Sequence, residues 1–213
     1  MINLCIINGS PKVSNSNSDF FIKELTSSFN NDIYITKYYV REIFKDNSLL
    51  NDIIKNDKLV IVSPLYADSF PSITLQFLEL FGDFLEKNAH SKIDVYGIIN
   101  CGFFEGNQNR TALNILEHFC NRSNLKWQFG LGIGGGEYLS TLTETSPMSQ
   151  SLYSALSILR SHIQNLENTK HDNILLNPDK MSASLYRLSA NLGWYLMSFQ
   201  KTHKIPHLRK KIY

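Results

Sequence analysis

Hydroxyl and amide side chains gather in one segment near the N-terminus. From Asn8 to Ser18 the chain carries four serines, three asparagines and one lysine. The segment lies between an apolar run at 2–7 and apolar residues spaced by four from residue 21, so we expect it between a buried strand and a helix. A helix N-terminus attracts anions, and hydroxyls donate to phosphate oxygens. The segment therefore predicts a phosphate-monoester site, although a plain polar loop with a serine or asparagine cap has the same composition.

Two other phosphate-binding patterns are missing from this segment. It lacks GxxxxGK[ST], which excludes the usual nucleoside-triphosphate loop, and it lacks GxGxxG, the turn that holds a dinucleotide. A literal GxGxxG match does occur at 130–135. It lies on the last predicted strand with no β-α-β unit after it, so we expect structural glycines there.

Two further segments combine rigid backbone with aromatic rings. Residues 63–71 carry two prolines around Tyr66 and Phe70, and residues 100–106 place Phe103 and Phe104 beside a glycine. Each segment follows a predicted strand. Because ligands bind at the carboxyl ends of parallel strands, we expect these segments to converge with the polar loop. Together they predict a ligand with a phosphate tail and a planar head.

The elements that position these loops alternate along the chain. Strands are predicted at 2–7, 33–40, 59–62, 93–99 and 127–133, and apolar residues at helical spacing lie between most of them. This alternation indicates a parallel sheet covered on both faces. After Pro147, apolar stripes at 152–166 and 185–199 predict two helices with no strand between them, followed by a basic tail at 207–211.

Composition excludes several classes of protein. The 213 residues carry 21 Lys and Arg against 19 Asp and Glu, a net charge of +2, and 43% are hydrophobic. Such a chain folds, and its near-neutral charge argues against nucleic acid as a partner. No run approaches the ~20 apolar residues of a membrane span, so we expect no membrane partner. Three widely spaced cysteines, Cys5, Cys101 and Cys120, offer neither a disulfide framework nor a metal site, which favours the cytoplasm.

The first two loops resemble those of a known family. The runs Ile-Asn-Gly-Ser-Pro-Lys at 7–12 and Ser-Asn-Ser at 16–18 resemble the FMN phosphate loop of flavodoxin-like NAD(P)H-dependent FMN reductases. Ser-Pro-Leu-Tyr at 63–66, followed by Asp68, Ser69 and Pro71, resembles the second flavin loop of that family. The resemblance covers about residues 1–140. The chain differs in carrying Lys12, where arginine is common, and in its helical C-terminal segment.

The resemblance implies a set of cofactor-binding residues and no catalytic side chain. Those implied to hold the FMN phosphate are Ser10, Lys12, Ser16, Asn17 and Ser18. Those implied to line the isoalloxazine, chiefly through backbone groups, are Pro64, Leu65, Tyr66, Ala67, Asp68 and Ser69. Gly102 and Phe103 are implied to close the other side of the ring. No metal is implied.

The resemblance also implies a fold. We expect a three-layer α/β flavodoxin-like fold with a five-stranded parallel sheet in the order 2-1-3-4-5. Residues 1–145 would form the FMN-binding domain, and residues 146–213 a helical extension packed on the same domain. We expect the apolar stripe and aromatic residues of the last helix to form a homodimer.

The activity implied is that of an FMN-dependent oxidoreductase. It would pass electrons from NADH or NADPH to a small acceptor, namely a quinone, a nitro- or azo-aromatic compound, or a flavin. The alternative is a flavodoxin-type electron carrier without nicotinamide turnover. Such carriers are shorter and distinctly acidic, so the +2 charge and the C-terminal helices count against it. A third possibility, a binding module without a flavin, is disfavoured by the serine-rich loop.

Overall fold

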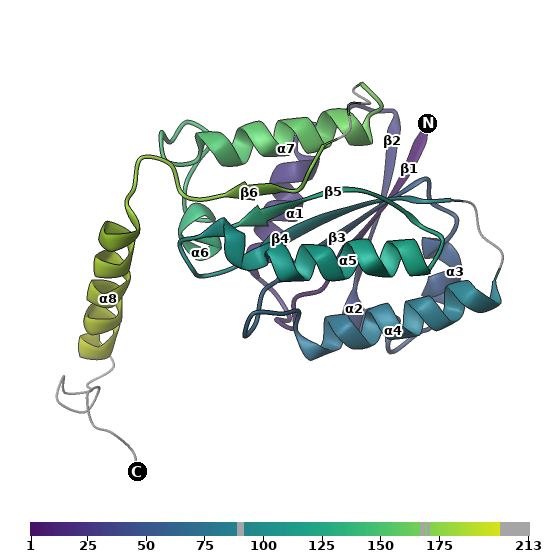
Figure 1. The fold of residues 1–213 in the computed structure, drawn as a ribbon, viewed down its shortest axis with the longest axis horizontal. Coiled ribbons are helices and arrows are strands. Elements are labelled where there is room, and N and C mark those ends of the chain that lie inside the picture. The colour runs from purple at the N-terminus through teal and green to yellow at the C-terminus, as the bar shows by residue number, and fades with distance from the viewer. Residues whose placement is uncertain (89–91, 167–168, 170, 201–213) are drawn as a thin grey trace, which may run out of the picture. The chain divides into compact units, whose positions relative to one another are not determined.

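A six-stranded, entirely parallel sheet runs through the centre of the computed structural model (Figure 1). The structure describes residues 1–88, 92–166, 169 and 171–200. The strands are β1 (Ile2–Asn8), β2 (Ile33–Tyr39), β3 (Lys58–Pro64), β4 (Asp94–Asn100), β5 (Lys126–Ile133) and β6 (Ile174–Leu176). Their order is β2-β1-β3-β4-β5-β6.

The sixth strand corrects the prediction of five strands. β6 pairs with residues 131–133 of β5 and lies between the last two long helices, where no strand was expected. Three residues are too short to show a strand period in the sequence. The strand is placed by tertiary contacts instead, since the Gly130 N–H donates to Asn173 Oδ1 at 2.8 Å just before β6 begins.

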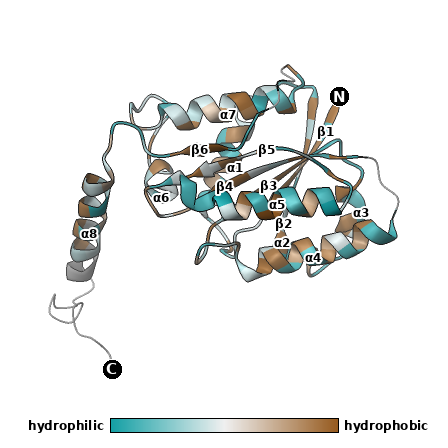
Figure 2. Cartoon of the chain, in the orientation of Figure 1, coloured by the Kyte–Doolittle hydropathy of each residue, from teal (hydrophilic) through white to brown (hydrophobic). Residues whose placement is uncertain are grey.

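Helices cover both faces of the sheet. One face carries α1 (Asn17–Thr26), the short α6 (Gly136–Leu139) and α7 (Gln150–Ile163). The other face carries α2 (Val40–Ile43), α3 (Leu49–Ile53), α4 (Ser72–Lys87) and α5 (Arg110–Arg122). A 3-10 turn, η1 (Gly106–Asn109), leads into α5. Figure 2 shows that α4, α5 and α7 carry both hydrophobic and hydrophilic residues, as expected of helices with one buried side.

The alternation of side chains along β1 explains why its sequence is apolar throughout. Leu4 and Ile6 pack under α1 and α7, whereas Cys5 and Ile7 pack under the helices of the other face. All four are fully buried. A central parallel strand has no solvent face, so its hydrophobic run is continuous rather than alternating.

Two predicted helices end earlier than their apolar stripes suggested. α1 ends at Thr26 and α7 ends at Ile163, so Phe29 and Leu166 lie outside them. Phe29 still packs against the core from the loop, while Leu166 is 72% exposed. Periodic spacing therefore predicted the helices correctly but extended both of them by about one turn.

The chain divides into two compact units, Met1–Asp179 and Lys180–Tyr213. The first unit extends beyond the predicted boundary at 145, because α7 packs on α1 and β6 completes the sheet. The second unit contains α8 (Ala183–Gln200). The predicted basic tail at 207–211 lies outside the described residues, and packing of residues 180–213 on the first unit stays a prediction. Within the described part of the chain, no helix has the length and apolar character needed to cross a bilayer.

The end of β5 depends on a glycine. Gly134 donates its N–H to the Leu176 carbonyl at 2.8 Å, and a methyl group on Gly134 would overlap the Phe104 carbonyl and lie 2.6 Å from the Gly106 nitrogen. We expect Gly134→Ala to lower the free energy of unfolding by about 1–3 kcal/mol, measured by urea denaturation. The control is Gly102→Ala, because no atom lies within 4 Å of the added methyl. Equal stability of the two variants would contradict this packing.

Candidate functional site

A cavity of about 190 Å³ lies at the carboxyl ends of β1, β3 and β4. It is lined by Ser10, Lys12, Ser16, Asn17, Ser18, Pro64, Leu65, Tyr66, Asn100, Cys101, Gly102 and Glu137. Nine of these residues belong to the predicted cofactor-binding set. The structure therefore brings together three segments that are far apart in the sequence.

The sheet topology explains this position. β1 and β3 are neighbours in the sheet, but the chain leaves β1 for α1 on one face and leaves β3 for α4 on the other. The two connections diverge and leave a crevice between them. Crevices at such a switch point are the usual ligand sites of open parallel sheets.

Hydrogen bonds hold the loop between β1 and α1 at its start and at its tip. The Gly9 N–H donates to the Val62 carbonyl, and Thr74 Oγ1 donates to the Gly9 carbonyl, both at 2.8 Å. At the tip, the guanidinium of Arg41 donates to the carbonyls of Lys12 and Val13 at 2.9 and 3.0 Å. These hydrogen bonds tie the backbone of the loop to β3, α4 and α2.

Ser16 caps α1, so it is less available to bind a phosphate directly than predicted. Its hydroxyl accepts from the Asp19 N–H at 3.1 Å and donates to Asp19 Oδ2 at 2.8 Å. The Ser16 N–H also donates to Asp19 Oδ2, at 3.2 Å, which completes a capping box. Ser16 lines the cavity, but its polar groups already have partners in the helix cap.

Asp19 is a residue that the sequence analysis missed. Beyond its bonds to Ser16, its Oδ1 accepts from Asn8 Nδ2 at 2.9 Å, from Lys37 Nζ at 2.8 Å and from the Tyr39 hydroxyl at 2.8 Å. Partial burial acts to raise the pKa of Asp19, but these donors outweigh it and hold the pKa well below its ordinary value. The carboxylate thus links the end of β1, the start of α1 and β2. Only its position three residues after a serine, the capping-box spacing, hinted at this in the sequence.

Ser18 has a buried hydroxyl without a partner. The residue is 1% exposed, lies in the first turn of α1 and lines the cavity, and its Oγ makes no hydrogen bond within the described structure. Leaving such a group unpaired costs free energy, so it marks a place where a bound acceptor belongs. Ser10, 4% exposed, lies in the same lining, and its Oγ accepts from the Lys12 N–H at 3.3 Å.

The second loop contributes three residues to the cavity and folds the next three into a turn. Pro64, Leu65 and Tyr66 line the cavity. Tyr66 and Ser69 exchange two backbone hydrogen bonds, of 2.7 and 3.1 Å, around residues 67 and 68, both of which have positive φ. The predicted residues Ala67, Asp68 and Ser69 are therefore outside the lining, and their turn holds Tyr66 at its edge.

The third loop is tied to the second. The Leu65 N–H donates to the Asn100 carbonyl at 2.8 Å, and Asn100 Nδ2 donates to the Ser63 carbonyl at 3.2 Å. Gly102 lines the cavity as predicted, whereas Phe103 is 53% exposed and is not in its lining. Asn100 was missed because an amide at the end of a strand looks like an ordinary turn residue.

Cys101 and Glu137 are also part of the lining. Burial raises the pKa of the Cys101 thiol, and Asn109 Nδ2 donates to its sulfur at 3.4 Å. Nucleophilic cysteines have a lowered pKa, so we assign Cys101 no catalytic role. Glu137, on the short helix α6, brings the one carboxylate of the lining, opposite in charge to Lys12.

The hydrogen bonds of Asp19 predict that its contribution to the free energy of unfolding depends on pH. We expect Asp19→Asn to lower the free energy of unfolding by about 2 kcal/mol at pH 7, because the hydrogen bonds that its carboxylate accepts from four residues lose their charged acceptor. The folded-state pKa is depressed, so the stabilisation exists above the unfolded value of about 4 and fades as the pH falls below it. Urea titrations of both proteins at pH 7, 5 and 3 measure this. Asp32→Asn, at an exposed position, is the control, and a difference that stays constant down to pH 3 would contradict the assignment.

Comparison with known proteins gives matches in structure alone. No family model matches the chain, and no curated protein matches its sequence. An NADPH-quinone reductase from P. pentosaceus matches with a TM-score of 0.53 and 17% identity, over 79% of this chain and 99% of that one. An FMN-dependent NADH-azoreductase from Bacillus anthracis, solved with FMN, matches with a TM-score of 0.53 and 16% identity, over 79% and 100%.

A flavodoxin, WrbA-like protein from Agrobacterium tumefaciens matches with a TM-score of 0.54 and 10% identity, over 78% of this chain and 97% of that one. At such identities the likeness is one of fold. By name these structures are two reductases and a flavodoxin, and the first two loops of this chain resemble those of flavodoxin-like FMN reductases. The chain has the flavodoxin-like α/β fold, which it shares with flavin-dependent NAD(P)H reductases.

Proposed function

We propose that the protein is an FMN-dependent oxidoreductase that passes electrons from NADH or NADPH to a small acceptor. The observation that carries the proposal is the unpartnered, buried hydroxyl of Ser18 at the N-terminus of α1, inside the cavity. A phosphate there would supply the missing acceptor and would gain from the helix dipole. The residues present therefore fit the group.

Four of the five residues predicted to hold the phosphate keep that role in the proposal. Ser10 and Ser18 offer hydroxyls, Asn17 an amide and Lys12 a positive charge, all in the lining of the cavity. The fifth, Ser16, acts indirectly, since it caps the helix whose N-terminus faces the phosphate. The hydrogen bonds of Asp19 support this arrangement, because they join the start of α1 to β1 and β2.

The second and third loops would hold the planar ring. Pro64, Leu65 and Tyr66 line one part of the cavity and Asn100 and Gly102 another. When bound, FMN supplies the redox chemistry, accepting hydride from a nicotinamide and reducing a second acceptor. The chain contributes position and exclusion of water, and we assign no catalytic side chain.

The acceptor in the proposal is a flat aromatic molecule, such as a quinone or an azo compound. Tyr66 at the cavity and Phe103 in the third loop are 47% and 53% exposed, and such rings stack on flat partners. Solved structures with this fold include a quinone reductase and an azoreductase by name. The three cysteines are free and buried, which supports a reducing compartment such as the cytoplasm.

One observation favours the alternative of an electron carrier. Counted alone, residues 1–179 carry 14 Lys and Arg against 19 Asp and Glu, a net charge of −5. The first unit is therefore acidic, as carriers are, even though the whole chain is not. Turnover with a nicotinamide separates the two functions, since a carrier binds the flavin without being reduced by NADH or NADPH.

We expect purified protein to bind one FMN per chain, with the absorbance bands of a flavoprotein. Anaerobic addition of NADH or NADPH should bleach those bands, and a quinone should restore them. Binding of FMN without reduction by either nicotinamide would favour the carrier, and absence of FMN binding would overturn both. A released cofactor that migrates as FAD would contradict the proposed monophosphate site.

The phosphate assignment has its own test in Ser18→Ala. We expect FMN affinity to fall about 10- to 100-fold, because a hydrogen bond to a charged group is lost. Riboflavin, which lacks the phosphate, should bind almost unchanged, and fluorescence titration measures both. The folded protein loses no internal hydrogen bond, since Ser18 Oγ has no protein partner in the described structure. Ser72→Ala, at an exposed position, is the control, and equal losses for both ligands would reject the phosphate site.

A further inference from the structure

Arg41 reaches the tip of the loop between β1 and α1 from outside the cavity. It is the second residue of α2, which follows β2 directly, and it is half-buried. Its Nη1 and Nη2 groups donate to the carbonyls of Lys12 and Val13 at 2.9 and 3.0 Å. Arg41 is not among the residues that line the cavity. Any influence of its hydrogen bonds on a ligand therefore passes through the loop.

Few other contacts hold the tip of this loop, residues 11–15. All five residues are exposed, and Asn15 has a positive φ of 53°. Within the described structure, the two bonds from Arg41 are the only hydrogen bonds that join the tip to the chain outside the loop. A third bond, from the Lys12 N–H to Ser10 Oγ at 3.3 Å, lies within the loop. The position of the tip therefore depends on Arg41.

Tyr39 holds Arg41 in place. The guanidinium carbon of Arg41 lies 3.8 Å from the centre of the Tyr39 ring, within the range of a cation–π contact. The Tyr39 hydroxyl donates to Asp19 Oδ1 at 2.8 Å, which ties the far end of the ring to the start of α1. The Tyr39 N–H donates to Glu42 Oε2 at 2.9 Å in the first turn of α2. The segment from the end of β2 into α2 thus supports both the start of α1 and the tip of the loop.

The hydrogen bonds of Arg41 also orient two peptide groups. In a planar trans peptide, the N–H of one residue points away from the carbonyl of the residue before it. Because the carbonyls of Lys12 and Val13 face Arg41, the N–H groups of Val13 and Ser14 face away from it. Neither N–H has a hydrogen-bond partner within the described part of the chain. Both can therefore donate to an anion, as can the side chain of Lys12 in the cavity lining.

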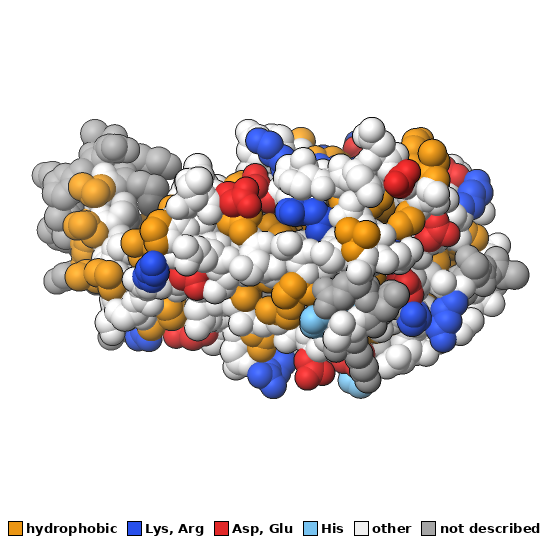
Figure 3. Space-filling model, turned by 90° about the horizontal axis from the view of Figure 1, so that it is seen from above, with side chains coloured by type: hydrophobic (Ala, Val, Ile, Leu, Met, Phe, Trp, Pro, Cys, Tyr) orange, Lys and Arg blue, Asp and Glu red, His pale blue; other side chains and the backbone are white. Residues whose placement is uncertain are grey.

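The charge of Arg41 favours an anion as well. Its guanidinium forms no ion pair among the described residues, whereas Lys37 pairs with Asp19 at 2.8 Å. Residues 1–179 have a net charge of −5, and on the face drawn in Figure 3 acidic and basic side chains are interspersed. The overall charge of the first unit thus does not attract a phosphate. Positive charges close to the loop have to do so, because distant charges are screened by salt.

We propose that Arg41 is a positioning residue for the phosphate of the cofactor. It would hold the tip of the loop so that Lys12 and the N–H groups of Val13 and Ser14 are directed at the phosphate. The proposal rests on the proposed function, because it needs the phosphate of FMN in the cavity. It assigns a part in cofactor binding to the connection after β2, which contributes no residue to the cavity lining.

Two substitutions separate the hydrogen bonds of Arg41 from its charge. Arg41→Gln removes both, whereas Arg41→Lys keeps the charge but lacks the planar fork that reaches two carbonyls. We expect each substitution to raise the dissociation constant for FMN about tenfold or more, because the phosphate loses directed donors. The dissociation constant for riboflavin, which lacks the phosphate, should change by less than about twofold. Fluorescence titration measures both ligands.

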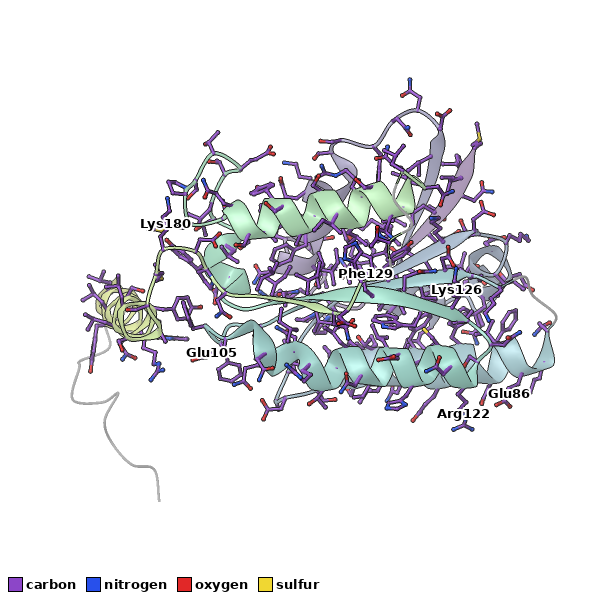
Figure 4. The ribbon with its side chains drawn as sticks, turned by 45° about the horizontal axis from the view of Figure 1, so that its top comes forward. Glu86, Glu105, Arg122, Lys126, Phe129 and Lys180 are labelled. Atoms are coloured by element: carbon purple, nitrogen blue, oxygen red, sulfur yellow. The ribbon has the colours of Figure 1, made fainter. Side chains whose placement is uncertain are left out.

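Arg122→Gln is the matched control. It removes the same charge from an exposed position at the end of α5. Figure 4 shows Arg122 at one end of α5 and Glu105, in the third loop of the site, beyond the other end. The substitution is therefore far from the proposed phosphate site, and this variant should bind FMN and riboflavin as the wild type does.

A second measurement examines the loop without any cofactor. Trypsin cleaves after lysine, and the carbonyl of Lys12 belongs to the peptide bond that would be cut. In the apoprotein, we expect cleavage between Lys12 and Val13 to be about tenfold faster in both Arg41 variants than in the wild type, because the tip opens more often. Mass spectrometry identifies the fragments, and circular dichroism verifies that each variant is folded.

Several results would overturn the proposal. Wild-type affinity for FMN in Arg41→Lys would mean that charge alone matters, and equal losses for FMN and riboflavin would mean that Arg41 has a general structural role. Unchanged cleavage after Lys12 in both variants would mean that Arg41 does not hold the tip. Each of these results, with normal FMN binding by the wild type, overturns this proposal alone. A wild type that binds no FMN would overturn the proposed function and this proposal together.

Discussion

Parallel pairing of β1 with both β2 and β3 is the constraint on which the site depends. A strand with neighbours on both sides and helices on both faces is exposed to solvent only at its ends. The chain leaves β1 toward one face and β3 toward the other, so the carboxyl edge opens between them. Loops that would be unrelated on separate elements are thereby forced to share one cavity.

Asp19 places a negative charge beside the proposed anion site, and its hydrogen-bond partners explain how the two coexist. Lys37 forms an ion pair with Asp19, and Asn8, Ser16 and Tyr39 donate hydrogen bonds to it. The negative charge is therefore compensated within the protein. The hydroxyl of Ser18, in the first turn of α1, remains for a ligand. The same network that makes the loop rigid also lowers the pKa of the acid at its centre.

Charge is divided unevenly between the two units. Residues 1–179 have a net charge of −5, whereas residues 180–213 carry seven Lys and Arg and no Asp or Glu. The residues that line the cavity all belong to the first unit, so the proposed flavin site is built from the acidic part of the chain.

Apolar periodicity and turn residues are local signals, so the sequence alone determined the alternation of strands and helices and the parallel sheet. Nine residues of the cavity lining were implied by the resemblance of its loops to those of flavodoxin-like FMN reductases. The sequence did not determine β6, which is only three residues long and is defined by its pairing with β5. It also could not determine that Ser16 caps a helix while Ser18 stays free, or that Asp19 gathers donors from β1 and β2. Those roles arise from contacts between residues up to 20 positions apart, and only the tertiary structure brings such residues within hydrogen-bonding distance.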